Sequence, residues 1–167
     1  MKKFKDNLTD FFKWVKGTEL VELDDIDVSE DPVRPELTLG FRIMQGRKIF
    51  GLKYNEEVEA IVCVAFCPEV PHTVREMDYM SQAANQDGQR GEILVAYTVW
   101  SRKRGAGKEI MKKAIEHVIK NMDNIERIVT LSPLTPMATH YHIRNGAKLI
   151  SINSDTQNFE YTINRKK

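Results

Sequence analysis

The chain has 167 residues, of which 41% are hydrophobic and 29% are charged, and its 25 basic residues nearly balance its 24 acidic ones to give a formal net charge of +1. This length predicts one domain with its own hydrophobic core. The near-neutral charge excludes general attraction to nucleic acid or to a membrane surface, so any anion site must be local.

The two cysteines and the N-terminus indicate the compartment. Cys63 and Cys67 lie four residues apart in an apolar run, which predicts two buried thiols and no metal site. The lysine-rich start is interrupted by Asp6 and Asp10 and therefore does not resemble a secretory leader. No apolar run is long enough to span a bilayer. We expect a cytoplasmic protein.

The first half of the chain alternates helical and strand patterns. Residues 1–17 are expected to form an N-terminal helical extension, because four apolar residues there recur at helical spacing, and residues 18–167 to form one domain. Within that domain we predict a strand in 18–29 and a helix from Pro35 to about Gln45 that ends at Gly46. A hairpin of strands 47–54 and 58–66 follows, and then a loop or weak helix over 71–90.

The second half predicts an α/β fold. Its elements are a strand at 92–100, an amphipathic helix at 105–122, a strand at 125–131, a short helix at 137–144 and strands at 147–153 and 158–164. Such an order favours a single mixed sheet of about six to seven strands flanked by helices. The unit 92–131 should be a right-handed crossover between parallel strands.

The stretch SRKRGAGKEIM, residues 101–111, opens the amphipathic helix with two glycines and a basic cluster. A helix N-terminus carries unpaired N–H groups and the positive end of the helix dipole, and Gly105 and Gly107 leave those groups accessible. These features together describe a pyrophosphate site. The alternative is a tight strand-to-helix turn with solvated charges. A nucleic-acid patch is disfavoured, because the basic run is short and no aromatic residues are interleaved with it. The basic residues are Arg102, Lys103, Arg104 and Lys108.

The pattern Arg102-x-x-Gly105-x-Gly107 resembles the R/Q-x-x-G-x-G/A signature of the GNAT superfamily of acyltransferases, and the element order is similar to the GNAT fold. The resemblance implies that the turn 102–108, Ala106 included, binds the pyrophosphate of acetyl-CoA or another acyl-CoA. It also implies a splay between the strands at 92–100 and 125–131. The pantetheine arm would lie there against the backbone of Tyr97, Thr98 and Val99.

A second informative stretch is TLSPLTPMATHYHIRNGAKLI, residues 130–150. In many GNAT enzymes a helix with the spacing A-x-x-x-Y-x-x-x-G provides the tyrosine that protonates the CoA thiolate. His142 occupies the tyrosine position here, and Tyr141 would point elsewhere. Residues 130–147 also resemble the catalytic domain of malonyl-CoA decarboxylase, which implies a catalytic pair of Ser132 and His142. The alternatives are a helix cap for Ser132 and a core histidine for His142.

The amine acceptor must lose a proton before it attacks a thioester. Glu92, at the start of the central strand, is the best-placed candidate base; weaker candidates are Glu57, Glu59 and Asp78. The region 71–90 would lie over the acceptor side. Its acidic residues suit a cationic amine, although three acids in twenty residues is also ordinary loop composition; they are Glu76, Asp78 and Asp87.

The resemblance therefore implies an acyl-CoA-dependent acyltransferase that passes acetyl to an amine by direct attack. Two alternatives stay open. One is a lyase similar to malonyl-CoA decarboxylase that uses His142 and Ser132. The other is a non-catalytic acyl-CoA-binding or interaction module. We expect no metal, no nucleic acid and no membrane partner, and the pairing common among GNAT-like proteins leaves a homodimer open.

Overall fold

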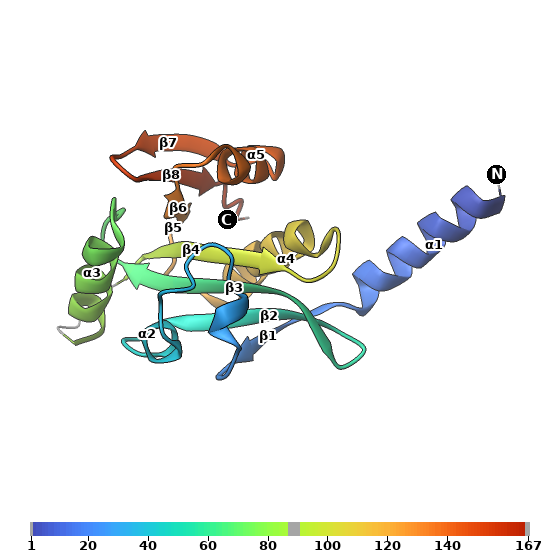
Figure 1. The fold of residues 1–167 in the computed structure, drawn as a ribbon, viewed down its shortest axis with the longest axis horizontal. Helices are drawn as coiled ribbons and strands as arrows, with labels where there is room; N and C mark the ends of the chain where they lie inside the picture. The colour runs from blue at the N-terminus through green and yellow to red at the C-terminus, as the bar shows by residue number, and fades with distance from the viewer. Residues whose placement is uncertain (1, 87–90, 166–167) are drawn as a thin grey trace.

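The computed structural model describes residues 2–86 and 91–165, which leaves Asp87 of the predicted acidic set outside the described residues. Within these ranges the chain forms one eight-stranded sheet in the order β1-β2-β3-β4-β5-β8-β6 (Figure 1). The eighth strand, β7, lies off this path and also pairs with β8. Neighbouring strands are antiparallel except for the parallel pair β4–β5. The predicted mixed α/β sheet is confirmed, with eight strands in place of six to seven.

The first half differs from prediction at the helix expected from Pro35. Its elements are α1 (Lys2–Gly17), β1 (Glu19–Leu23), the 3-10 turn η1 (Val28–Glu30), α2 (Leu39–Ile43), β2 (Lys48–Tyr54), β3 (Glu57–Cys67) and α3 (Val74–Gln86). The helix expected from Pro35 was wrong: α2 begins only after Thr38, whose hydroxyl accepts from the Phe41 N–H at 3.1 Å. Of the two alternatives for 71–90, a loop or a weak helix, the structure shows the helix, with 13 residues.

The second half follows the predicted order closely. Its elements are β4 (Ile93–Ser101), α4 (Ala106–Asn121), β5 (Arg127–Thr130), β6 (Ser132–Pro133), α5 (Pro136–Arg144), β7 (Lys148–Ile152) and β8 (Thr156–Tyr161). The last strand begins two residues before the predicted 158–164 and ends three residues earlier. The unit β4–α4–β5 is the predicted crossover, with the two strands parallel.

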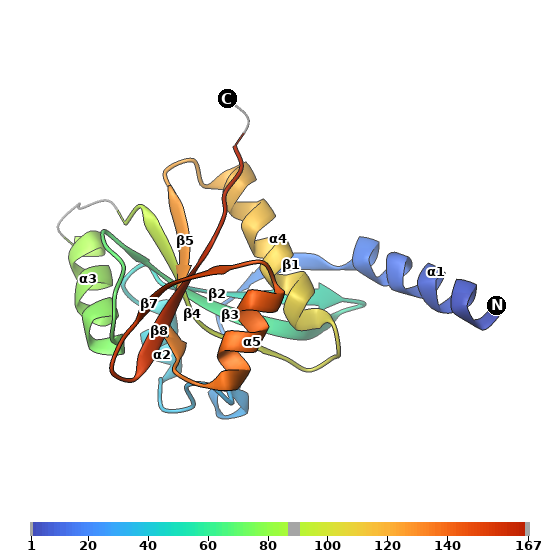
Figure 2. The same cartoon turned by 90° about the horizontal axis from the view of Figure 1, so that it is seen from above.

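The core has one apolar cluster on each face of the sheet. Successive side chains of β4 alternate between the faces: Leu94 and Ala96 belong to the cluster under α4, and Ile93 and Val95 to the cluster that includes Met77 of α3. Figure 2 shows α4 and α3 on opposite sides of the central strands. Apolar side chains thus cover both faces of the sheet around β4, so this strand lies between two packed layers.

Helix α1 projects from the body of the fold (Figures 1 and 2). Its C-terminal end is anchored by Trp14, which is 6% exposed and donates its indole N–H to the Glu59 carboxylate at 2.6 Å. The Lys103 ammonium lies 4.9 Å from the centre of the indole ring. The division between an extension at 1–17 and a domain at 18–167 stays a prediction. None of the helices in the described ranges combines the length and the apolar character needed to cross a bilayer.

Candidate functional site

The central feature of the site is the end of β4, where the sheet opens as predicted. β4 pairs with β5 as far as Ala96 and Thr130, and the Leu131 N–H donates to the Ala96 carbonyl at 2.9 Å. Beyond that point the chain of β5 continues into β6, which pairs with β8 and not with β4. The last five residues of β4, 97–101, therefore have no strand partner on that side.

A bulge accompanies this opening. On the other side of β4 the register with β3 shifts, so that Cys63 pairs with Thr98 and Val64 with Ala96, which leaves Tyr97 as the extra residue. A bulge turns the backbone groups of its residues out of the regular ladder. The Tyr97 carbonyl consequently accepts a hydrogen bond from a side chain, that of Arg34.

The glycine turn follows β4 and caps α4. Gly105 is the N-cap residue, with φ +86° in the left-handed region, and no side chain caps the helix. A Cβ at this position would meet no atom within 4 Å, so the turn is open to solvent. Within residues 91–165 the backbone N–H groups of Gly107 and Lys108 have no hydrogen-bond acceptor. These two groups, at the positive end of the α4 dipole, are arranged to bind an anion.

The predicted basic cluster divides into two kinds of residue. Arg102 donates to the Glu30 carboxylate at 2.6 Å and to the Val58 carbonyl at 3.1 Å. Lys103 lies 3.6 Å from the Glu59 carboxylate. Arg104 and Lys108 are exposed, and neither has a carboxylate within ion-pair distance among the described residues. These last two residues are free to meet a phosphate, whereas the first two pack the turn onto η1 and β3.

The two residues of the predicted catalytic pair have different hydrogen-bond partners. His142 is 5% exposed, its Nδ1 atom lies 2.7 Å from the Tyr161 hydroxyl, and its ring stacks on Phe159. Burial lowers the pKa of His142 to about 4, so the imidazole is neutral at pH 7. The Ser132 hydroxyl instead lies 2.8 Å from that of Thr130. In the part of the chain that the structure describes, no hydrogen bond joins Ser132 to His142.

Two more residues from the sequence analysis are Tyr141, which contacts the first turn of α4 after the end of β4, and Glu92, which lies just before the start of β4. The Tyr141 hydroxyl donates to the Gly107 carbonyl at 2.6 Å and so fastens α5 to the first turn of α4. The Tyr141 ring nevertheless lies 4.8 Å from the ring of His142 in an edge-to-face contact, so the expectation that Tyr141 points elsewhere is not confirmed. Glu92 precedes β4, and at about 3.3 Å per residue it lies roughly 16 Å along the strand from Tyr97. This placement does not favour Glu92 as a base for chemistry at the bulge.

Sequence analysis missed a buried charged cluster that connects the segment before α2 to the bulge. The Asp31 carboxylate accepts from Arg42 at 2.7 Å and from the Thr98 hydroxyl at 2.9 Å. It also caps the backbone N–H groups of Val33 and Arg34 at 2.8 and 3.1 Å. The aspartate thus satisfies the backbone of these two residues locally.

Arg34 extends from this cluster into the opening of the sheet. Its Nε atom donates to the Tyr97 carbonyl at 2.9 Å and its Nη2 atom to the Leu131 carbonyl at 3.0 Å. One guanidinium therefore bridges the two strands where they part. The residue is 7% exposed. No spacing rule pointed to it, because its partners lie 63 and 97 positions away in the sequence.

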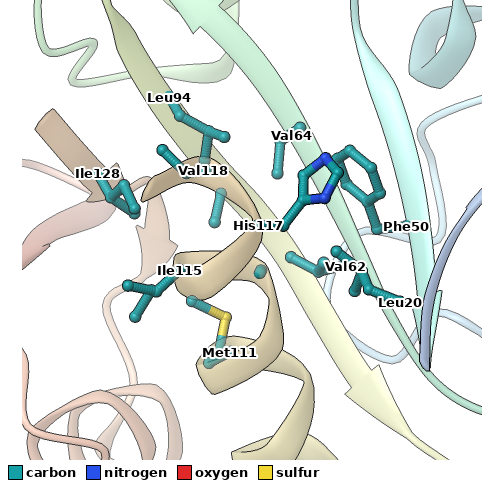
Figure 3. Close-up of a pocket in the computed structure, with 12 residues that line it drawn as sticks. Leu20, Phe50, Val62, Val64, Leu94, Met111, Ile115, His117, Val118 and Ile128 are labelled. Carbon is teal, nitrogen blue, oxygen red and sulfur yellow. The ribbon is translucent and has the colours of Figure 1, made fainter. Parts of the chain in front are cut away.

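A hollow lies between α4 and the sheet, apart from the opening beside β4 (Figure 3). Its walls are apolar side chains, among them Phe50, Val62 and Met111, and its sole polar lining side chain is His117. The imidazole of His117 packs on Phe50, with 5.4 Å between the ring centres. The hollow presents no convergent polar groups and belongs to the core packing.

The comparisons with known proteins agree on the architecture. A Bacillus subtilis acetyltransferase in complex with CoA superposes with a TM-score of 0.59 at 8% identity, covering 86% of this chain and 97% of that one. A Thermus thermophilus acetyltransferase superposes with a TM-score of 0.53 at 13% identity, covering 86% and 96%. The chain has the GNAT fold.

A malonyl-CoA decarboxylase from Cupriavidus metallidurans superposes with a TM-score of 0.54 at 22% identity over 75% of this chain. The chain spans only 33% of the length of that decarboxylase. No family model and no curated protein sequence matches this chain. The comparisons therefore establish the GNAT fold and leave the activity to the residues of the site.

Proposed function

We propose that the chain is an acyl-CoA-dependent acyltransferase that passes the acyl group to an amine by direct attack. The observation that carries this proposal is the open glycine turn at the N-terminus of α4, placed directly after the end of β4 that has no strand partner on the β5 side. Within the described residues, two N–H groups of the turn have no acceptor and two exposed basic side chains have no carboxylate partner, so all four can meet the pyrophosphate. The opening of the sheet leads from there to the bulge at Tyr97.

In this arrangement the pantetheine arm follows β4 from Ser101 toward Tyr97, and the thioester lies at the bulge. The roles that the resemblance implies for Thr98 and Val99, backbone contacts with the arm and polarisation of the thioester carbonyl, are part of the proposal. The neutral amine nitrogen bonds to the carbonyl carbon as the carbon–sulfur bond breaks, CoA leaves as the thiolate, and the nitrogen releases one N–H proton to water as the amide forms. A thiol has a pKa near 8.5, so the thiolate can take a proton from water and needs no strong acid.

The proposal does not depend on His142, Ser132 or Glu92. A histidine with a pKa of about 4 is a neutral imidazole at pH 7, whose remaining N–H is a very weak acid, so the proposed acid role would require a rearrangement. The hydroxyl of Ser132 is engaged with Thr130. Their catalytic roles, the cationic acceptor and the homodimer stay predictions.

The test is calorimetric titration with CoA and acetyl-CoA of the wild type, Gly105→Glu and Gly146→Glu. Both glycines have positive φ, +86° and +92°, and at both an added Cβ meets no atom within 4 Å. The two substitutions therefore impose comparable backbone strain. Only the change at Gly105 places a carboxylate beside the α4 N-terminus.

We expect Gly105→Glu to weaken CoA binding by roughly tenfold or more, since loss of charge-assisted hydrogen bonds costs about 1.5–3 kcal/mol. Gly146→Glu should bind as the wild type does. If the wild type binds no CoA, or if both variants lose binding equally, the pyrophosphate site is refuted. Binding with no transfer to any amine would instead leave the non-catalytic module, and acceptor-independent release of CO2 from malonyl-CoA would favour the lyase.

A further inference from the structure

The charged cluster at the bulge contains two buried arginines and one buried carboxylate. Arg42 and Asp31 form an ion pair of 2.7 Å in which both side chains are fully buried. Arg34 has no carboxylate within ion-pair distance among the described residues. The cluster thus holds two positive charges and one negative charge, and the positive charge without an ion pair is on a residue that is 7% exposed.

A buried charge without a counter-ion is costly, because desolvation of an ion in a protein interior amounts to several kcal/mol even after relaxation. Burial accordingly lowers the pKa of Arg34, with partial compensation from Glu36 and Asp31. The two carbonyls of Tyr97 and Leu131 satisfy two of its donors but carry no net charge. Such charges in proteins are paired or serve a ligand.

The guanidinium is also held in a fixed position. The Arg34 backbone N–H donates to Asp31, and the Arg34 carbonyl accepts from Arg42 at 2.7 Å. The side chain is fixed by Nε and Nη2, while Nη1 has no hydrogen-bond partner within the described ranges. A preorganised donor of this kind binds a planar anion with little loss of side-chain entropy.

We propose that Arg34 binds the carboxylate of the acyl group, so that the donor is the CoA thioester of a dicarboxylic acid, of the malonyl or succinyl class. This inference rests on the proposed function. The guanidinium bridges the carbonyls of both strands and therefore lies within the opening, where the acyl end of a thioester running along β4 would arrive. An acyl carboxylate neutralises the charge that the cluster leaves uncompensated, whereas the acetyl group expected from the resemblance does not.

The experiment measures the affinities of CoA, acetyl-CoA, malonyl-CoA and succinyl-CoA by calorimetry, with mass spectrometry to verify that each thioester stays intact. The variants are Arg34→Gln and, as a matched control, Arg47→Gln. Arg47 is also buried, at 4% exposed, but it donates to Ser81 and Asp78 of α3 and not to the opening. Circular dichroism and urea unfolding establish that each variant folds.

A charge-assisted hydrogen bond is worth about 1.5–3 kcal/mol. The wild type should therefore bind malonyl- or succinyl-CoA roughly ten- to hundredfold more tightly than acetyl-CoA. Arg34→Gln should lose this preference and keep its affinity for CoA itself, and Arg47→Gln should keep both.

If CoA and acetyl-CoA bind as well as the carboxylated thioesters, the inference is overturned and the acyltransferase proposal stands. A preference that survives in Arg34→Gln overturns the role of Arg34. If no thioester and no CoA binds to the wild type, both proposals fail. The wild-type comparison needs no variant, so the inference remains testable even if Arg34→Gln does not fold.

Discussion

Substitution of Arg42 by methionine should destabilise the fold severely, because it removes the one ion-pair partner that the buried Asp31 carboxylate has among the described residues. Both side chains are fully buried, and the ion pair is 2.7 Å long. Arg42 also donates to the carbonyls of Arg34 and Leu37 at 2.7 and 3.0 Å. Removal of one partner from such a pair costs about 3–5 kcal/mol. At about 2.1 cal/mol/K per residue, a chain of 167 residues should melt roughly 9–14 °C lower.

The assay is equilibrium unfolding in urea together with a thermal melt, and Lys48→Met provides the matched control. Lys48 pairs with Glu22 at 3.0 Å, but the two side chains are 36% and 57% exposed. Exposed pairs contribute about 0–1 kcal/mol, so this variant should melt within a few degrees of the wild type. A loss in Arg42→Met no larger than that in Lys48→Met would refute the buried-charge argument.

Two further predictions concern buried titratable groups. Burial lowers the pKa of His142 from 6.5 to about 4, so the folded protein favours the neutral imidazole and the unfolded chain takes up the proton first. The contribution of His142 to the free energy of unfolding is complete above pH 6.5 and falls by up to about 3 kcal/mol as the pH drops to 4. Between pH 7 and pH 5, the free energy of unfolding measured in urea should therefore decrease by about 2 kcal/mol more in the wild type than in His142→Gln. Burial raises the pKa of Cys63 to about 11 and of Cys67 to about 12, and both thiols are fully buried. Ellman's reagent at pH 8 should therefore detect no thiol in the native protein and both after denaturation, and a fast-reacting native thiol would contradict the packing.

The parts of the site that the sequence predicts are those fixed by local chemistry. Gly105 is needed because the residue before α4 adopts φ +86°, and this requirement is visible as a glycine between a strand and an amphipathic run. The strand at 92–100 is similarly marked by its own apolar residues. The pattern of the helix around His142 also predicts its span, 136–144 in the structure against 137–144.

The parts that the sequence does not predict depend on distant partners. Asp31 and Arg34 lie in a polar, proline-containing stretch in which charged residues are ordinarily exposed. Their burial follows only from contacts with Thr98 and Leu131, which are brought to them by the fold. The orientation of His142 toward Tyr161 likewise depends on β8, whose register no local rule specifies.

Binding at the glycine turn and binding at Arg34 should depend differently on the salt concentration. At the glycine turn Arg104, Lys108 and the α4 N-terminus face solvent, so their attraction to a pyrophosphate is screened over about 8–10 Å at 0.1–0.15 M salt. Arg34 is buried, and its contact with a carboxylate is screened far less. Raising the salt from 0.05 to about 0.5 M should therefore weaken binding of CoA, acetyl-CoA and malonyl-CoA in parallel, and the malonyl-to-acetyl affinity ratio should change by less than about twofold. A ratio that collapses along with the overall affinity would mean that the carboxylate is recognised by the exposed basic residues of the turn, and the assignment of Arg34 would be wrong.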